Sequence, residues 1–178
     1  MWTGDMLPSD HGKNLHKEGV MTLKELEARI TVLEDIEEVK KVMCSYCHFV
    51  NTSQWDSVLA LFADNAKADW GPLGTYEGKD GIATYFTNMV AAIMPWTAHE
   101  VLNPIITVEG NKAKGTFYLW APTTVKMADV ETAIWIQGRY DNEFIKEGGR
   151  WKFSLLKYAF DFMTPYEDGW VKTKMMGG

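Results

Sequence analysis

The sequence predicts an α+β fold, because helical patterns occupy its first half and strand patterns its second half. The chain has 178 residues, which fits one domain with a sizeable core. Helices followed by strands joined through short turns are typical of this class, whereas a parallel sheet needs strands and helices in alternation. Aromatic residues are frequent, with 8 Trp, 8 Phe and 7 Tyr, and such side chains fill cores or line pockets for apolar ligands.

Apolar residues at steps of three and four predict helices in the first hundred residues. Pro95 stops the last of them, because proline cannot continue a helix. The predicted segments are a helix opened by the capping box of Thr22 and Glu25, a second apolar stripe over residues 36–50, a short helix capped by Ser53, and a helix capped by Asp80.

Segments rich in β-branched and aromatic residues predict strands. The glycine-containing turns at residues 109–111 and 147–149 each join two of these segments, which indicates antiparallel hairpins. The predicted strands cover residues 66–70, 98–108, 112–120, 131–146 and 150–162.

The two ends of the chain lack these patterns. Residues 1–20 show neither helical nor strand periodicity and are expected to be a tail, with a composition typical of disorder. A second tail is expected at residues 167–178, which leaves one domain over residues 21–166.

Charge and hydropathy limit the partners. The net charge of −6 argues against binding to nucleic acid, which attracts basic proteins. No apolar run is long enough to cross a membrane, and none follows the N-terminus as a secretory signal would. We therefore expect a cytoplasmic protein.

Two cysteines, Cys44 and Cys47, are spaced as in redox and zinc motifs, but they lie inside a helical pattern without two further ligands at the usual spacing. They are interpreted as small buried helix residues. No phosphate-binding loop or metal cluster is visible, so no cofactor and no metal is expected.

Several motifs occur in a characteristic order between residues 22 and 165. They are Y46-C-H-F-V-N51-T-S-Q-W55-D, A-K-A-D69-W70 before a glycine-rich turn, H99-E-V-L-N103-P, G138-R-Y-D-N-E-F and G149-R-W151-K-F. In this order the chain resembles the NTF2-like superfamily, and within it the SnoaL-like branch of polyketide cyclases and dehydratases. The resemblance implies a cystatin-like α+β fold: a strongly curved, mixed or antiparallel sheet wraps around the N-terminal helices as a cone-shaped barrel that admits a ligand. It also implies a homodimer or a homotrimer.

The resemblance suggests three catalytic positions. His99 matches the histidine that acts as base in the dehydratases, and imidazole chemistry suits that role near neutral pH. Tyr46 matches a polar or phenolic helix position that steadies a ligand oxygen. Asn51 stands where these enzymes carry an aspartate that pairs with the histidine, so His99 is expected to be a weaker base. A core histidine and a core tyrosine are the alternative readings.

Other polar positions of the family are absent. Ala121 and Phe160 stand where the bile-acid dehydratase has an acid and an arginine, and Lys157 has the opposite strand parity. Asp69 or Asp161 could replace the acid, although each fits a solvated carboxylate equally well.

The remaining candidates are aromatic and are expected to bind the substrate. Some of them could instead pack in the core or at a subunit interface. They are Trp70, Phe86, Tyr118, Trp120, Trp135 and Phe160.

Three functions follow from these observations. The first is a cofactor-free lyase or isomerase that acts on a small apolar, aromatic or alicyclic molecule through His99. The second is a non-catalytic module that binds the same class of ligand. The third is a structural subunit resembling the small chain of a ring-hydroxylating dioxygenase, because the fold alone does not determine the reaction.

Overall fold

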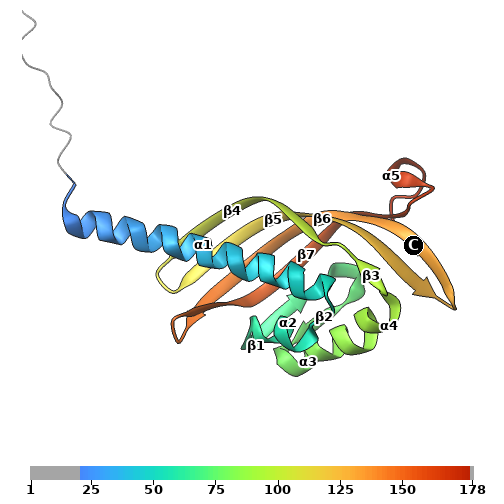
Figure 1. Cartoon of the computed structure of the whole chain (residues 1–178), viewed down its shortest axis with the longest axis horizontal. Coiled ribbons are helices and arrows are strands. Elements are labelled where there is room, and N and C mark those ends of the chain that lie inside the picture. Colours follow the sequence, from blue (N-terminus) through green and yellow to red (C-terminus); the bar gives the residue numbers. More distant parts are fainter. Residues whose placement is uncertain (1–20, 177–178) are drawn as a thin grey trace, which may run out of the picture.

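The computed structural model describes residues 21–176, so the tail predicted for residues 1–20 lies outside the described residues. Within them the α+β class is confirmed, with helices first and a seven-stranded mixed sheet after them (Figure 1). The helices are α1 (Leu23–Asn51), α2 (Trp55–Ala60), α3 (Gly78–Thr84), α4 (Ala91–Ile93) and α5 (Gly169–Lys172). The strands are β1 (Phe62–Asp69), β2 (Thr75–Glu77), β3 (Trp96–Thr97), β4 (Glu100–Glu109), β5 (Lys112–Met127), β6 (Val130–Glu147) and β7 (Arg150–Pro165).

Helix α1 joins the first two predicted helical segments, because no glycine or proline interrupts residues 23–51. The capping box is confirmed: the Glu25 N–H donates to Thr22 Oγ1 over 3.2 Å, and the Thr22 N–H donates to the Glu25 carboxylate over 2.8 Å. Ser53 does not cap the next helix, because its φ of 55° places it in the turn before Gln54, the actual N-cap.

The helix predicted from Asp80 begins two residues earlier, at Gly78, so Asp80 is not its cap. After Thr84 the backbone widens into a π-helical segment, η2 (Tyr85–Val90), before α4. Such segments are rare and often lie at functional sites, because the wider turn redirects side chains.

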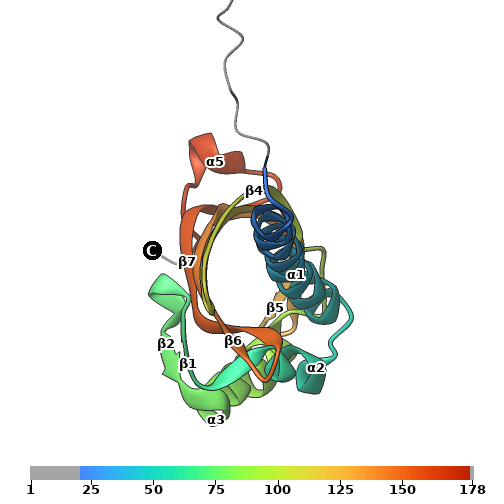
Figure 2. The ribbon, with the colours of Figure 1, turned by 90° about the vertical axis from the view of Figure 1, so that its left-hand side faces the viewer.

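The sheet order is β2-β1-β7-β6-β5-β3, and β4 also pairs with β5. Strands β1 and β7 run parallel and the other neighbours antiparallel, so the predicted mixed sheet is confirmed. Its edges do not meet, and the sheet is therefore not closed into a barrel. Figure 2 shows the curved strands on one side of the core and α1 across the open side.

Strand β5 continues past the predicted end at Trp120 because Pro122 does not interrupt it. The Pro122 carbonyl accepts a hydrogen bond from the Ala98 N–H over 3.0 Å. This contact does not use the N–H that proline lacks, so β5 keeps its contact with the segment at Ala98. The hairpin to β6 then turns at Ala128 and Asp129, which both have positive φ. This extension lengthens the inner wall of the sheet.

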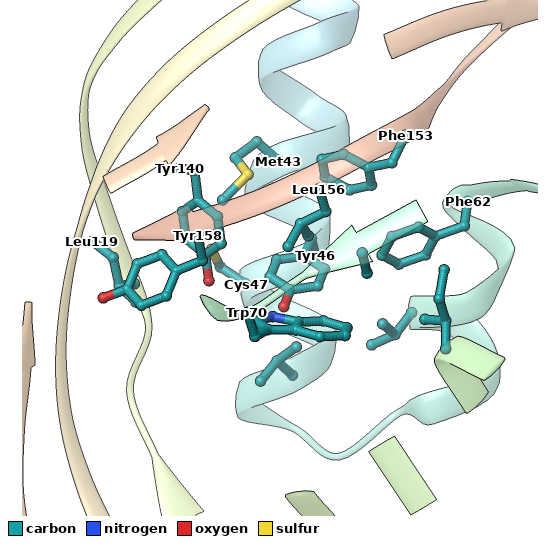
Figure 3. Packing of buried hydrophobic residues seen from close by; sticks show 14 of the residues in the cluster. Met43, Tyr46, Cys47, Phe62, Trp70, Leu119, Tyr140, Phe153, Leu156 and Tyr158 are labelled. Atoms are coloured by element: carbon teal, nitrogen blue, oxygen red, sulfur yellow. The ribbon is translucent and has the colours of Figure 1, made fainter. Parts of the chain in front are cut away.

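Strand alternation decides which side chains face α1. Odd-numbered residues of β5 and even-numbered residues of β6 are buried against the helix, as the pairing of Phe117 with Tyr140 requires. Figure 3 shows the centre of this core, where the ring of Tyr46 from α1 lies among buried side chains of the sheet. Its ring makes edge contacts with Phe153 and Tyr140, at centroid distances of 5.7 and 6.2 Å.

A buried ionic contact fixes the middle of α1 to the sheet. Asp35 accepts hydrogen bonds from Lys146 Nζ over 2.6 Å and from Trp151 Nε1 over 2.8 Å. The hydrogen bond and the charge of Lys146 hold the pKa of Asp35 below its usual value.

Residues 167–176, expected to be a tail, fold back onto the sheet. Helix α5 packs on β7, and the Met176 N–H donates to the Met163 carbonyl over 2.7 Å. None of the helices among residues 21–176 is both long and apolar enough to span a membrane.

Candidate functional site

A cavity of about 260 Å³ lies between the sheet, the C-terminal half of α1 and the η2 segment. This volume is slightly below the range of about 300–1,000 Å³ that pockets for drug-sized ligands usually have. No Asp, Glu, Lys or Arg occurs among the described residues that line it. Its wall is formed by aliphatic, methionine and aromatic side chains, so the cavity suits a compact ligand without charge.

His99 contributes the imidazole on this wall. It is half-buried, and its ring Nδ1 lies 3.1 Å from the hydroxyl of the buried Thr97. Burial lowers the pKa of His99 to about 4, because apolar surroundings disfavour the imidazolium. The ring is therefore uncharged at neutral pH and retains one nitrogen, Nε2, for a ligand.

Tyr46 lines the same cavity from α1. Burial raises the pKa of its phenol, while hydrogen bonds with Tyr140 and Trp70 act in the opposite direction. In Figure 3 the Tyr46 oxygen lies beside the indole nitrogen of Trp70. Burial likewise raises the pKa of Tyr140. Both phenols therefore stay protonated. Tyr140 donates its proton to the Tyr46 oxygen, which leaves the Tyr46 hydroxyl free to donate to a ligand oxygen.

Asn51 holds the main chain of His99 and not its ring. Asn51 Oδ1 accepts the His99 N–H over 2.7 Å, and Asn51 Nδ2 donates to the His99 carbonyl over 3.4 Å. The amide at the end of α1 thus fixes the short connection between β3 and β4 that carries the imidazole.

Of the six aromatic candidates, three line the cavity: Trp70, Phe86 and Phe160. Trp70 stacks on Tyr85 at a centroid distance of 3.7 Å, and Phe86 stacks on Trp55 at 5.6 Å.

The structure does not bring the other three, Tyr118, Trp120 and Trp135, to the cavity. They alternate onto the outer face of the sheet, where the rings of Trp120 and Trp135 lie 5.0 Å apart. Leu119 and Ile136 occupy the inner positions beside them. The parity of β6 follows from the Gly148-Gly149 turn, which sets Phe144 opposite Phe153 in the core.

The candidate acids lie outside the cavity lining. Asp69 Oδ1 accepts the Gly71 N–H over 2.9 Å and so stabilises a turn. Asp161 and Lys157 are exposed on β7, and Ala121 is buried on the inner face of β5. No described carboxylate therefore replaces the aspartate that the family resemblance implies.

Sequence reasoning missed several polar side chains of the site. Thr97 and Thr123 connect to the His99 ring, and Tyr140 and Tyr158 line the cavity from the sheet. Tyr140 could have been found by extending the alternation from the hairpin turn. Tyr158 could not, because a β-bulge after Phe153 reverses the parity of β7. The threonines carried no signal, because their hydroxyls meet only through the pairing of β3 with β5.

Tyr158 is a further unusual group. Its side chain is buried, and its hydroxyl has no hydrogen-bond partner among the described residues. Its ring lies over Gly138, where a Cβ would come within 2.6 Å of the hydroxyl oxygen and 2.2 Å of the Ala159 carbonyl oxygen. Glycine is thus required at position 138 for the ring to lie flat on the sheet.

Neither cysteine belongs to the site. Cys47 is buried as predicted, but Cys44 is exposed, because the two residues lie on different sides of α1. Within residues 21–176, no group of three or more His, Cys, Asp and Glu side chains is placed to hold a metal ion.

Residues 31–157 match the model of the family described as the SnoaL-like domain. The chain belongs to this family. The resemblance stated from the motifs is thereby confirmed for most of the SnoaL-like domain predicted over residues 21–166. No protein with a curated description matches the chain.

Solved structures similar to this SnoaL-like chain support the same fold. A candidate scytalone dehydratase from Novosphingobium aromaticivorans DSM 12444 has a TM-score of 0.70 and 18% identity, over 84% of this chain and 98% of its own. Hexachlorocyclohexane dehydrochlorinase LinA-type3 from Novosphingobium barchaimii LL02 has a TM-score of 0.65 and 22% identity, over 80% and 92%. A candidate aromatic ring hydroxylase from Novosphingobium aromaticivorans DSM has a TM-score of 0.65 and 29% identity, over 76% and 96%.

Proposed function

We propose that this SnoaL-like protein binds an uncharged, mainly apolar alicyclic or aromatic compound and moves a proton of it through His99, in a cofactor-free elimination or isomerisation. The observation that carries the proposal is an imidazole on the wall of a cavity without charged lining residues. With a pKa of about 4, His99 is neutral at physiological pH and so has a lone pair for a proton, but it is a weak base that depends on the substrate to stabilise the imidazolium. Two proteins of similar fold are named for a dehydration and a dehydrochlorination.

The tyrosines supply the second half of the chemistry. When a C–H proton leaves, negative charge develops on a ligand oxygen or on the leaving group. Tyr46 keeps its phenolic proton because burial raises its pKa, and Tyr140 donates to the Tyr46 oxygen, so the Tyr46 hydroxyl can donate to that charge. Trp70, Phe86 and Phe160 would enclose the ring of the compound, and Asn51 would hold His99 in place.

The test is proton exchange with solvent, measured by NMR in D₂O. The probe is 2-tetralone, an uncharged bicyclic ketone with acidic C–H bonds. We expect the protein to accelerate deuterium incorporation above the buffer rate, and His99→Ala to lose at least about 100-fold of that acceleration. His48→Gln is the matched control, because His48 lies on the exposed side of α1 and should leave the rate unchanged.

A second candidate is a binding module without turnover. It is favoured by the position of Asn51, whose hydrogen bonds reach the main chain of His99 and leave the ring without a carboxylate. Under this alternative, native mass spectrometry would find a retained small molecule and apolar ligands would raise the melting temperature, while the protein would not accelerate deuterium exchange of 2-tetralone.

A third candidate is a subunit of a larger oxygenase. The aromatic outer face of the sheet favours it, because Trp120, Trp135 and Phe162 form a cluster there that Trp170 extends. The 29% identity to a candidate aromatic ring hydroxylase agrees with this reading. Co-purification with an iron-containing chain would support it, whereas a native mass of two or three identical chains would favour the homodimer or homotrimer.

A further inference from the structure

Two buried threonines link the His99 ring to the sheet. His99 Nδ1 lies 3.1 Å from Thr97 Oγ1, which lies 2.9 Å from Thr123 Oγ1. The Thr123 hydroxyl in turn donates to the Ala121 carbonyl over 3.4 Å. Thr97 and Thr123 are 6% and 2% exposed, so water does not compete for these contacts. The chain of hydrogen bonds therefore ends at a main-chain acceptor.

The end of the chain determines its direction. A carbonyl accepts hydrogen bonds and cannot donate them, so the single Thr123 proton is committed to Ala121. Thr97 must then donate to Thr123, and its own oxygen can accept only from a protonated His99 Nδ1. This order forms three hydrogen bonds. The reverse order, with Thr97 donating to Nδ1, leaves the Ala121 contact unmade and forms two.

We infer that Thr97 and Thr123 are positioning residues that hold His99 as the tautomer protonated on Nδ1, so that Nε2 offers a lone pair to the cavity. They take the place at the ring that a carboxylate takes in an Asp–His pair. The contacts of the threonines stand without the proposed function, but their catalytic consequence rests on it.

The uncharged hydroxyls have a consequence for the substrate. A carboxylate would stabilise the imidazolium, whereas hydroxyls orient the ring without supplying that charge. The imidazolium then needs its counter-charge from the substrate itself. The structure therefore favours an uncharged compound with a C–H bond next to a carbonyl group. The C–H bond breaks, an N–H bond forms at Nε2, and the electron pair moves to the carbonyl oxygen as an enolate. The proton returns at another carbon, or a leaving group departs.

The direct test is the protonation pattern of His99 in ¹⁵N-labelled, ligand-free protein at pH 7, read from long-range ¹H–¹⁵N NMR correlations. The His99 signals are assigned by their loss in His99→Gln. We expect the wild-type protein to carry the proton on Nδ1. A proton on Nε2 would overturn the inference, and the protonation pattern itself is measured on the wild-type protein.

Substitutions sharpen the test. Thr123→Val removes the acceptor of Thr97, whose hydroxyl should then donate to Nδ1 and move the ring proton to Nε2. That tautomer has no lone pair in the cavity, so exchange of 2-tetralone should fall at least about tenfold. Thr97→Val should give mixed tautomers, and Thr97→Ser should restore the wild-type pattern. Thr124→Val, on the outer face of β5, is the matched control.

The two hypotheses fail in different ways. If the tautomer responds as expected but neither wild-type nor variant protein exchanges 2-tetralone, the positioning role stands and the proposed reaction does not. If 2-tetralone is exchanged through His99 but neither Thr→Val variant alters the tautomer or the rate, the positioning role is overturned.

Discussion

Two titratable groups of this protein, the buried Asp35 and the half-buried His99, lie in opposite environments. Asp35, in the middle of α1, has a cation and an indole N–H within hydrogen-bonding distance. Asn51 at the C-terminal end of the same helix lies about 24 Å from Asp35 along the helix axis, at 1.5 Å per residue. His99 lies beside Asn51 and is hydrogen-bonded to it. Its ring meets an uncharged hydroxyl and an apolar cavity.

The difference shows how one fold uses burial in two ways. The partners of Asp35 stabilise its charged form, so its pKa is lowered and the contact strengthens the native state at neutral pH. His99 has no such partner among the described residues, so burial makes its charged form unfavourable. The first arrangement holds the fold together, whereas the second keeps a base neutral for a ligand. The following substitutions and titrations test this contrast.

Removing the carboxylate should have the largest effect. Asp35→Ala leaves Lys146 partly buried without a counter-charge and leaves the Trp151 N–H without its acceptor. We expect a loss of about 3 kcal/mol in the free energy of unfolding, measured by urea denaturation at pH 7.

The matched control is Glu143→Ala, which breaks the exposed pair with Lys114 and should cost less than about 1 kcal/mol. Equal losses for the two variants would contradict a structural role for Asp35. Because the folded pKa of Asp35 is lowered, its contribution is present above pH 3.8 and disappears as the pH falls through the folded value.

The second prediction concerns the pH dependence that His99 adds. Its folded pKa of about 4 lies below the ordinary value of 6.5, so between these values the unfolded chain binds the proton and the folded chain does not. Stability must therefore fall as the pH decreases through this window, by about 3 kcal/mol in total. The measurement is a series of urea denaturations from pH 7 to pH 4.

His99→Gln cannot take up the proton and should lack this part of the slope. His48→Gln should keep it, because His48 is exposed. If wild type and His99→Gln lose stability in parallel across the window, His99 is not held neutral by the fold.

Much of this contrast could not be predicted from the sequence. The fold class and the capping box follow from periodicity and spacing, because these are local patterns, whereas Tyr46 and His99 were selected by the resemblance to the family. The Asp35 contact could not be foreseen, since its partners lie more than 100 positions further along the chain. A charged residue inside a helix pattern normally indicates a solvated face.

The faces of the long strands were only partly predictable. The sequence predicts Trp120 and Trp135 in the cavity because aromatic side chains often line pockets for apolar ligands. The outer face of the sheet also carries rings, however, so residue type alone misassigns it. Strand parity decides between the faces, and parity depends on which turn sets the register.

The smallest expected effect comes from giving His99 the kind of partner that Lys146 has. In Asn51→Asp the carboxylate can still accept the His99 N–H, which Asn51 Oδ1 accepts over 2.7 Å, and loses only the longer bond to the carbonyl. A negative charge this close favours the imidazolium, so the pKa of His99 should rise. Since position 51 is exposed, solvent screening limits the rise to about one unit, or about 1.4 kcal/mol.

An NMR titration of His99 measures this rise in pKa, with Asn88→Asp as the control on exposed surface. An unchanged titration in Asn51→Asp would mean that burial alone fixes the protonation of His99. A rise would show that a charge at position 51 reaches the ring, although burial still holds the imidazole uncharged at neutral pH.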